Sequence, residues 1–268
     1  MSAAAASPGL GARVRPPAVL RLLSVLLVGT IWEVVGRGEP LFASYPTQIL
    51  SAGAETVGRE VIPAFGETLH GFGVGFGVAV LFGVPLGLLM SRSRLLELSL
   101  APYVAALYAT PRVALIPILI LWLGVDFNLR AGVVIISGIF PLILNAYLGG
   151  KEVDRDLLDV GTAFVATPFQ KLRTIVVPAS LPYIYAGVRI AIARSLIGTI
   201  VAEMEVATSG IGKIIKEDAK ALDMAEMFVP IIILGLLSIA LAAGVRWAER
   251  RTTMPWLWSK AKGSAAWL

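Results

Sequence analysis

The chain has 268 residues, of which 57% are apolar and only 15% are charged, and its mean hydropathy is +0.81. A water-soluble domain carries charge at roughly a quarter of its positions, so this composition predicts an all-α polytopic membrane protein. The absence of cysteine excludes disulfide-stapled folds, zinc–thiolate sites, iron–sulfur clusters and cysteine nucleophiles. Despite the net charge of +5, Lys and Arg stand between apolar runs rather than on one face, so we expect no nucleic-acid partner.

Six segments are apolar and long enough to be predicted as membrane-spanning helices, since each crossing of a bilayer takes about 20 residues. A tail at 1–18, without a signal-peptide core, precedes a six-span domain at 19–250, and a second tail occupies 251–268. The expected spans are Leu22–Val35, Ala64–Met90, Ala101–Leu123, Ala131–Leu148, Leu181–Val201 and Phe228–Val245.

The distribution of Lys and Arg predicts the orientation, because positive residues of short loops stay in the cytoplasm. One side carries Arg13, Arg15, Arg21, Arg92, Arg94, Lys151, Arg155, Lys171, Arg173, Arg246, Arg250, Arg251, Lys260 and Lys262. The other side carries Arg37, Arg59, Arg130, Lys213, Lys216 and Lys220. We therefore expect both termini and the loop 150–180 to be cytoplasmic, and the loops 37–63 and 205–226 to be external.

Glycines recur within the second span, at positions 71, 73, 75, 77, 83 and 87. A dinucleotide-binding fingerprint follows a strand and opens a helix, whereas this run lies inside an apolar segment. Pairs four residues apart, Gly71 with Gly75, Gly73 with Gly77 and Gly83 with Gly87, predict flat faces that neighbouring helices approach closely. The segment around Lys213 also fails as a phosphate-binding loop, because Ala207 and Ile214 replace a required Gly and Ser or Thr.

The third span contains Pro102, Pro111 and Pro117, with Arg112 beside the second. Prolines interrupt the helical hydrogen bonds, and a broken helix at membrane depth is tolerated where protein or water covers the freed carbonyls. Pro111 and Arg112 are thus candidates to line a solute pathway. The alternative is that both lie near the interface, where the arginine reaches water.

The fifth span contains Arg189, Arg194 and Glu203, and a charge inside the membrane costs roughly 3 kcal/mol or more unless it is paired or hydrated. Arg194 and Glu203 are separated by about 13 Å along a helix, so they do not pair directly. Each is expected to meet another span or a second subunit. A structural network and contact with an anionic solute both remain open. His70, the one histidine, is expected to be a packed or interfacial residue.

The loop 150–180 is expected to form two short helices. Asp154 or Asp156 is a candidate N-cap of the first, and Thr167 precedes Pro168 at the start of the second, before Pro178 and Pro182 interrupt the chain. The loop is unusually apolar, which predicts that it docks on something. A soluble partner protein is one candidate and the chain's own spans are the other. The apolar residues are Leu157, Leu158, Val160, Phe164, Phe169, Leu172 and Ile175.

The order of spans, this loop and the following segment GVRIAIARSLIGTIVAEMEVATSGIG resemble the membrane subunit (permease) of binding-protein-dependent ABC importers, in the nitrate, sulfonate, taurine and bicarbonate branch. The resemblance covers about residues 60–250. In that family the loop carries the motif E-A-A, three variable positions and G, followed by Leu-Pro, and forms a coupling helix that binds the ATPase. Counting back from Pro178 places Asp159 at the Glu position, Val160 and Gly161 at the Ala positions, and Val165 at the Gly position.

The resemblance implies a coupling contact through Asp159, Val160, Gly161, Phe164, Val165, Pro168, Phe169 and Pro178. Only the acidic character of Asp159 and the small size of Gly161 follow the motif. A glycine at a helix end usually supplies positive φ, which the β-branched Val165 adopts at substantial cost. We therefore expect the turn between the two helices to differ from that of the family.

The same resemblance implies a bacterial inner-membrane location and no resident cofactor, metal or catalytic residue, since ATP and Mg²⁺ belong to a separate ATPase. Its implied partners are ATPase subunits, an external solute-binding protein and a second permease copy. Pro111, Arg112, Arg189, Arg194 and Glu203 would line the pathway of a small anion such as a sulfonate, taurine, nitrate or bicarbonate. An ATP-independent transporter or channel also explains the spans, but not the apolar loop. An intramembrane enzyme would need a nucleophile and a base, which the chain does not offer together.

Overall fold

The computed structural model describes residues 17–38, 44–206 and 208–252, and this part of the chain contains helices and no strand. Short π- or 3₁₀-helical turns, labelled η, join several of the α-helices. In chain order the elements are α1 (Pro17–Gly38), α2 (Pro46–Thr56), η1 (Val57–Val61), α3 (Ile62–Arg92), α4 (Arg94–Ala109), η2 (Arg112–Leu115), α5 (Ile116–Leu123), α6 (Phe127–Lys151), α7 (Arg155–Ala163), α8 (Pro168–Lys171), η3 (Leu172–Val176), α9 (Val177–Val206), α10 (Ile211–Ala221) and α11 (Met224–Thr252).

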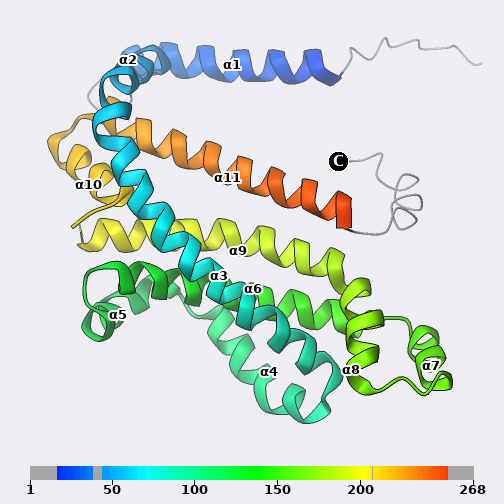
Figure 1. Ribbon diagram of the computed structural model, residues 1–268. Helices are drawn as coiled ribbons and strands as arrows, with labels where there is room; N and C mark the ends of the chain where they lie inside the picture. The colour runs from blue at the N-terminus through cyan, green and yellow to red at the C-terminus, as the bar shows by residue number, and fades with distance from the viewer. Residues whose placement is uncertain (1–16, 39–43, 207, 253–268) are drawn as a thin grey trace, which may run out of the picture.

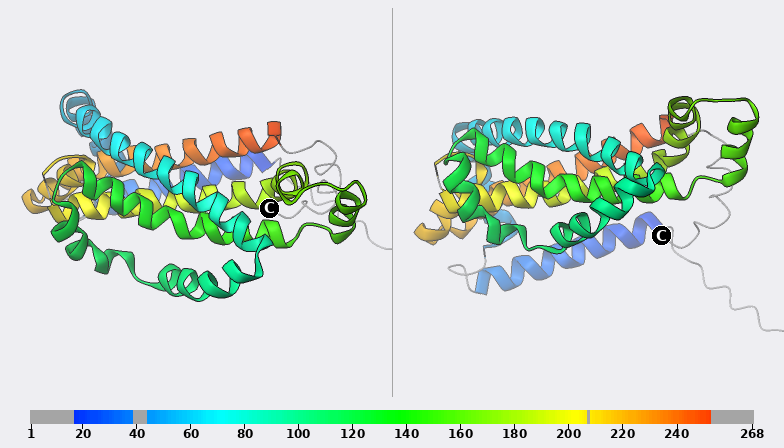
Figure 2. Two further views of the ribbon diagram at one scale, coloured as in Figure 1. Left: turned by 60° about the horizontal axis from the view of Figure 1, so that its bottom comes forward. Right: turned by 90° about the horizontal axis from the view of Figure 1, so that it is seen from below.

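Three long helices form the centre of the bundle, with α6 packed along α3 and α9 (Figure 1). Helix α11 lies beside α9, and α10 bridges α9 and α11 at one end. Helix α1 packs chiefly on α2 and leaves most of its apolar surface exposed, on the outside of the bundle (Figure 2). Because apolar surface is compatible with lipid but not with water, this exposure fits a chain that lies in a bilayer.

The glycines of α3 explain how closely α3 and α6 approach. A Cβ added at Gly75 would lie 2.6 Å from the carbonyl oxygen of Ala131, and one at Gly87 would lie 2.3 Å from that of Ile143. Gly71 and Gly83 also face α6, which confirms two of the three predicted glycine pairs. The prediction for the third pair was wrong. Gly73 and Gly77 have open space around them, because they lie on the opposite side of the helix.

Five helical segments are long and apolar enough to cross a membrane, and α4 with η2 and α5 forms a sixth crossing if the bent pair counts as one span. The helices extend beyond the predicted spans at both ends. For example, α6 begins at Phe127 rather than Ala131, and α11 runs to Thr252, past the predicted start of the C-terminal tail at residue 251. Charged residues end an apolar run without ending a helix, which explains the difference. Residues 1–16 and 253–268 of the predicted tails lie outside the described residues.

The third span is broken, as its prolines predicted. Helix α4 ends at Ala109, and the axis turns by 94° before the second arm, η2 with α5, begins at Arg112. Pro111 adopts an extended conformation at the break and is the N-cap of η2. The two arms bow outward from the other helices (Figure 2, left). The predicted single segment Ala101–Leu123 is therefore two helices, and the first of them begins earlier, at Arg94.

The loop 150–180 forms the two predicted short helices, α7 and α8. Asp154 caps α7 by accepting a hydrogen bond from the backbone N–H of Asp156. Thr167 caps α8, where its side chain and that of Gln170 form a capping box, with Pro168 in the first turn. Both caps satisfy backbone groups that the short helices cannot satisfy internally.

The expectation that Pro178 and Pro182 interrupt the chain was wrong. Helix α8, the π-helical η3 and α9 run without a break from Pro168 to Val206. The π-helical turn of Leu172–Val176 changes the hydrogen-bond register directly before Pro178, so the missing N–H of the proline is accommodated. Pro182 lies inside α9, as Pro141 lies inside α6, and prolines are tolerated within helices of membrane proteins.

The two ends of the bundle carry different elements (Figure 1). One end gathers α2, α10 and the turn before α6, where the side chain of Thr208 donates a hydrogen bond to the carbonyl of Val125. The other end gathers α7, α8, the junction of α3 with α4 and the C-terminal end of α11. The sequence predicted the same division, because successive spans place alternate loops on opposite sides of the membrane. The segments predicted to be external loops, 37–63 and 205–226, contain the helices α2 and α10.

Candidate functional site

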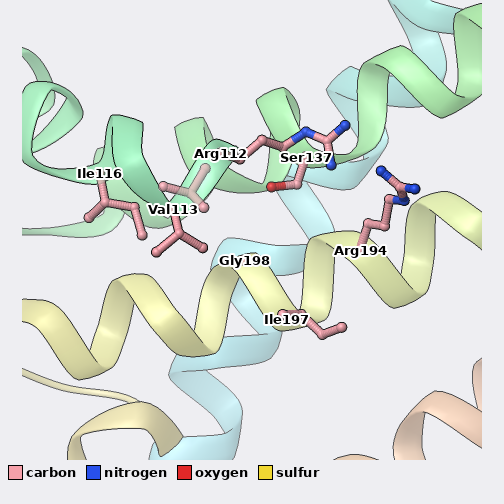
Figure 3. Close-up of a pocket in the computed structure, with 8 residues that line it drawn as sticks. Arg112, Val113, Ile116, Ser137, Arg194, Ile197 and Gly198 are labelled. Atoms are coloured by element: carbon pink, nitrogen blue, oxygen red, sulfur yellow. The ribbon is translucent and has the colours of Figure 1, made fainter. Parts of the chain in front are cut away.

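Two separate regions contain the residues that the sequence singled out. The first, here called the apolar tip, consists of Val160, Phe164, Val165 and Phe169 at the turn between α7 and α8. The second, the central cavity, lies near the break in the third span and is drawn in Figure 3. Its volume is about 190 Å³, and it is lined by Arg112, Val113, Ile116, Val133, Ser137, Arg194, Ile197 and Gly198.

The apolar tip projects from the end of the bundle. Phe164 and Val165 are 83% and 87% exposed, and Phe169 is 69% exposed. Gly161 is buried beneath them, where an added Cβ would lie 2.9 Å from the Cδ1 atom of Ile175. Gly161 therefore lets α7 lie close to η3, and this packing holds the apolar side chains outward.

Val165 adopts the left-handed conformation, with φ of 55°. Val165 thus supplies the positive φ that a glycine usually supplies, despite the cost expected for a β-branched residue. The backbone N–H of Val165 donates to the carbonyl of Thr162, and that of Ala166 donates to the carbonyl of Gly161, so the turn closes helix α7 as a glycine would. The β-branched side chain carries strain that these hydrogen bonds and the capping box of α8 offset.

The other motif residues take different positions. Asp159 is exposed on α7, and Pro168 is exposed at the start of α8, near the apolar tip. Pro178 lies in the first turn of α9, half-buried and away from the tip. Six of the eight predicted coupling residues thus lie on the exposed surface of this loop, and Gly161 supports them from below.

In the central cavity, Arg112 and Arg194 approach the same space from η2 and α9 (Figure 3). The Cζ atom of Arg112 lies 5.6 Å from the centroid of the Tyr108 ring, and that of Arg194 lies 4.7 Å from the same centroid. One aromatic ring thus stacks on two cations. The Nη2 atom of Arg112 also donates to the carbonyl oxygen of Tyr108, at the C-terminal end of α4.

Arg189 and Glu203 do not share this cavity. The Nη1 atom of Arg189 lies 2.5 Å from the Oε2 atom of Glu249 on α11. Glu203 is buried near the other end of α9, where it accepts hydrogen bonds from the hydroxyl of Thr68 and the backbone N–H of Gly212. Of the five predicted pathway residues, Arg112 and Arg194 therefore line the cavity, and Pro111 precedes Arg112 in the chain. The other two, Arg189 and Glu203, interact with residues of other helices.

The sequence reasoning missed Tyr108, Ser137 and Gly198 at the cavity, and also Thr68 and Glu249. Tyr108 precedes Arg112 by four residues, a spacing that brings two side chains together on a helix and would have pointed to it. The partners on other helices left no signal of this kind, because their proximity depends on how the spans pack. His70 packs against Phe127, with ring centroids 4.9 Å apart, in agreement with the expectation of a packed histidine.

On helix α10, Asp218 has a buried oxygen without a hydrogen-bond partner. Burial is the main cause that raises the pKa of Asp218, and the negative charges of Glu226 and Asp223 raise it further, to about 6. No group of three or more His, Asp or Glu side chains within the described ranges is arranged to hold a metal ion.

The sequence profile of the family described as "binding-protein-dependent transport system inner membrane component" matches residues 79–254. Relatives include the formylaminopyrimidine transport permease protein ThiX of Halalkalibacterium halodurans, 29% identical over 87% of this chain and 94% of its own. The nitrate import permease protein NrtB of Synechocystis sp. is 28% identical, over 88% of both chains. The taurine transport system permease protein TauC of Escherichia coli is 26% identical, over 87% of both.

The fold is similar to that of a chain in the inward-facing MetNI methionine ABC transporter. The TM-score is 0.65 at 18% sequence identity, and the match covers 72% of this chain and 96% of the other. At that identity the similarity concerns the fold alone. It supports the helical architecture described above.

Proposed function

Because the chain belongs to the family of binding-protein-dependent transport system inner membrane components, we propose that it forms the solute pathway of an ABC importer and couples it to ATP hydrolysis by separate ATPase subunits. ATP and Mg²⁺ would bind to those subunits. An external solute-binding protein would deliver the solute, and a second copy of this chain would complete the pathway. The complex would lie in the bacterial inner membrane with both termini in the cytoplasm.

The observation that carries this proposal is the apolar tip. Three apolar side chains, Phe164, Val165 and Phe169, are largely exposed at the end of the bundle where Lys and Arg are concentrated. Exposed apolar clusters of this kind are typical of protein interfaces, and aromatic residues in particular act as anchors in a partner's pockets. Since α8 continues through η3 into α9, a force applied at the tip would be transmitted along one helix to the central cavity.

The solute we propose is a small anion, such as a sulfonate, taurine, nitrate or bicarbonate. The names of the relatives leave this open, because they include a formylaminopyrimidine permease beside nitrate and taurine permeases. The central cavity favours the anion, since its two charged lining residues are both arginines. The candidate pathway therefore runs past Pro111, Arg112 and Arg194. Arg189 and Glu203 would support its helices rather than face the solute.

Co-purification tests the assignment. In mild detergent the tagged chain should bring down a P-loop ATPase, and the complex should hydrolyse ATP faster when the loaded solute-binding protein is added. The double variant Phe164→Ala/Phe169→Ala should lose the ATPase, because both side chains are exposed and contribute little to this chain's own packing. Arg155→Ala, on the exposed start of α7, is the matched control and should retain it.

A second variant separates coupling from assembly. Gly161→Leu should preserve the association of two permease copies but abolish solute-stimulated ATP hydrolysis, since the side chain would displace α7 from η3. Normal stimulation in this variant would contradict the coupling role. Accumulation of solute by vesicles that contain the chain without any ATPase would instead favour an ATP-independent transporter.

A further inference from the structure

The central cavity lies near the middle of the membrane-spanning helices. Arg194 is separated from the end of α9 at Val206 by 12 residues, roughly 18 Å at 1.5 Å per residue. Ser137 is separated from the start of α6 at Phe127 by ten residues, roughly 15 Å. Both lengths are near half of a hydrocarbon core about 30 Å thick. The cavity is therefore deep in the bilayer rather than at the headgroups.

The positive charge at this depth is not balanced within the described part of the chain. No carboxylate there lies within 4.0 Å of the guanidinium groups of Arg112 or Arg194. The C-terminal end of α4 offsets part of the positive charge of Arg112, because the guanidinium group donates a hydrogen bond to the carbonyl of Tyr108. The Nε atom of Arg112 is nevertheless buried without a hydrogen-bond partner. For Arg194, the contact found among residues 17–38, 44–206 and 208–252 is the face of the Tyr108 ring.

Holding two unbalanced guanidinium groups at membrane depth costs free energy, and an anion between them would remove that cost. The lining also limits the size of the anion. The cavity measures about 190 Å³, and its remaining walls are the apolar side chains of Val113, Ile116, Val133 and Ile197 with Ser137 and Gly198. This space suits a compact group with one charged end.

We infer that the central cavity is an anion-binding site of the membrane subunit itself, in which Arg112 and Arg194, both packed against the ring of Tyr108, hold the charged group of a small sulfonate-like solute. The inference rests on the proposed function for its biological role, but not for the binding itself. A lipid phosphate has the same chemistry. The depth of the cavity favours a free solute, because a headgroup would have to leave the interface to reach it.

Binding can be measured with the purified chain in a neutral detergent, without ATPase or solute-binding protein. The probe is methanesulfonate, and dimethyl sulfone, which has nearly the same shape but no charge, is its control. Thermal unfolding is followed at constant ionic strength, which is maintained with sodium gluconate. A ligand that binds only the folded chain raises the unfolding midpoint as its concentration increases. Methanesulfonate should raise it, and dimethyl sulfone should leave it unchanged.

Variants assign the binding to the two arginines. Arg112→Gln and Arg194→Gln should each raise the dissociation constant of methanesulfonate at least about tenfold, the usual effect of losing a charge-assisted hydrogen bond. Arg59→Gln removes an exposed charge at the far end of the bundle and is the control for net charge.

Three outcomes would overturn the inference. They are equal shifts with the anion and the neutral sulfone, an unchanged affinity in Arg194→Gln, and loss of the methanesulfonate effect when phosphatidylglycerol is added to the detergent. The last would assign the site to a lipid phosphate. Each is independent of the co-purification experiment, so failure of the anion site and failure of the importer assignment can be told apart.

Discussion

Helix α9 carries Arg189, Arg194 and Glu203 along its length, besides the exposed Glu205 near its end, and the surroundings of the first three differ in a way that separates packing from function. Arg189 is paired with Glu249 of α11, and Glu203 is surrounded by hydrogen-bond donors from α3 and the start of α10. Arg194, between them, faces a cavity and has no carboxylate partner among the described residues. All three are equally unusual in an apolar sequence.

The comparison shows that a buried charge is informative only together with its partners. The partners of Arg189 and Glu203 come from the chain itself, so these residues hold helices together. Arg194 lacks such a partner, which leaves room for a ligand. If this difference is real, substitutions at Glu203 and Arg189 should destabilise the fold, whereas substitution of Arg194 should affect transport more than stability.

The largest effect is expected at Glu203. Thr68 and Gly212 both donate to its carboxyl group, and the hydroxyl of Thr68 in turn accepts from the backbone N–H of Ile211. In Glu203→Ala the buried N–H of Gly212 loses its acceptor and a cavity forms, which together should cost about 3 kcal/mol. A decrease in the thermal midpoint of the detergent-solubilised chain of at least about 6 °C would record this loss.

Glu203→Gln is the matched variant, because its amide oxygen can still accept a hydrogen bond from Gly212. It should recover at least half of the loss. If the alanine variant were as stable as the wild type, the inference that Glu203 holds α9 to α3 and α10 would be wrong.

A smaller effect is expected for the pair of Arg189 and Glu249. Their side chains are 31% and 11% exposed, so the interaction is partly shielded from water. A double-mutant cycle with Arg189→Met and Glu249→Gln should give a coupling energy of about 1–2 kcal/mol. Thermal unfolding of the two single variants and the double variant supplies the measurement. A coupling energy near zero would place Arg189 in the same class as Arg194.

Much of the fold could be predicted from the sequence because the signals are local. Apolar runs placed the spans, Pro111 marked the break in the third span, and the sequence around Thr167 and Pro168 predicted the start of α8. The helix ends were less predictable, since hydropathy changes before the helix does. Pro178 and Pro182 were wrongly predicted to interrupt the chain, because a π-helical turn precedes Pro178 and α9 continues through Pro182.

The candidate site was less predictable because it depends on contacts between distant segments. The sequence marked Arg112 and Arg194 as charged residues within apolar segments. It gave no sign that both guanidinium groups pack against one ring, that of Tyr108 in α4. Likewise, nothing local in the sequence pairs Arg189 with Glu249, 60 residues away. Val165 shows the same limit in a turn, where hydrogen bonds of the surrounding structure impose a conformation that the residue alone disfavours.

Asp218 offers a pH-dependent contrast outside the membrane spans. Its pKa is raised from 3.8 to about 6, mainly by burial and then by Glu226 and Asp223. Between these two values the folded chain binds more protons than the unfolded chain, so stability falls as the pH rises from about 4 to 6 and stays low above that range. The midpoint of Asp218→Asn should therefore lie closer to the wild-type midpoint at pH 5 than at pH 7.5. Other carboxylates titrate in both the wild type and the variant, so the pH dependence of the difference between their unfolding midpoints reports on Asp218.

The smallest change in stability is expected at Arg194, the charge that the fold does not use. Arg194→Gln should shift the thermal midpoint by no more than about 2 °C, in either direction, because the variant loses a cation stacked on Tyr108 and is also relieved of an unpaired charge and its repulsion from Arg112. Transport by the assembled complex should nevertheless fall. A large destabilisation comparable to that of Glu203→Ala would mean that Arg194 holds the fold together, and the distinction among the charges of α9 would then be lost. A stable variant that transports poorly is the combination expected of a residue that faces the solute rather than one that holds the fold together.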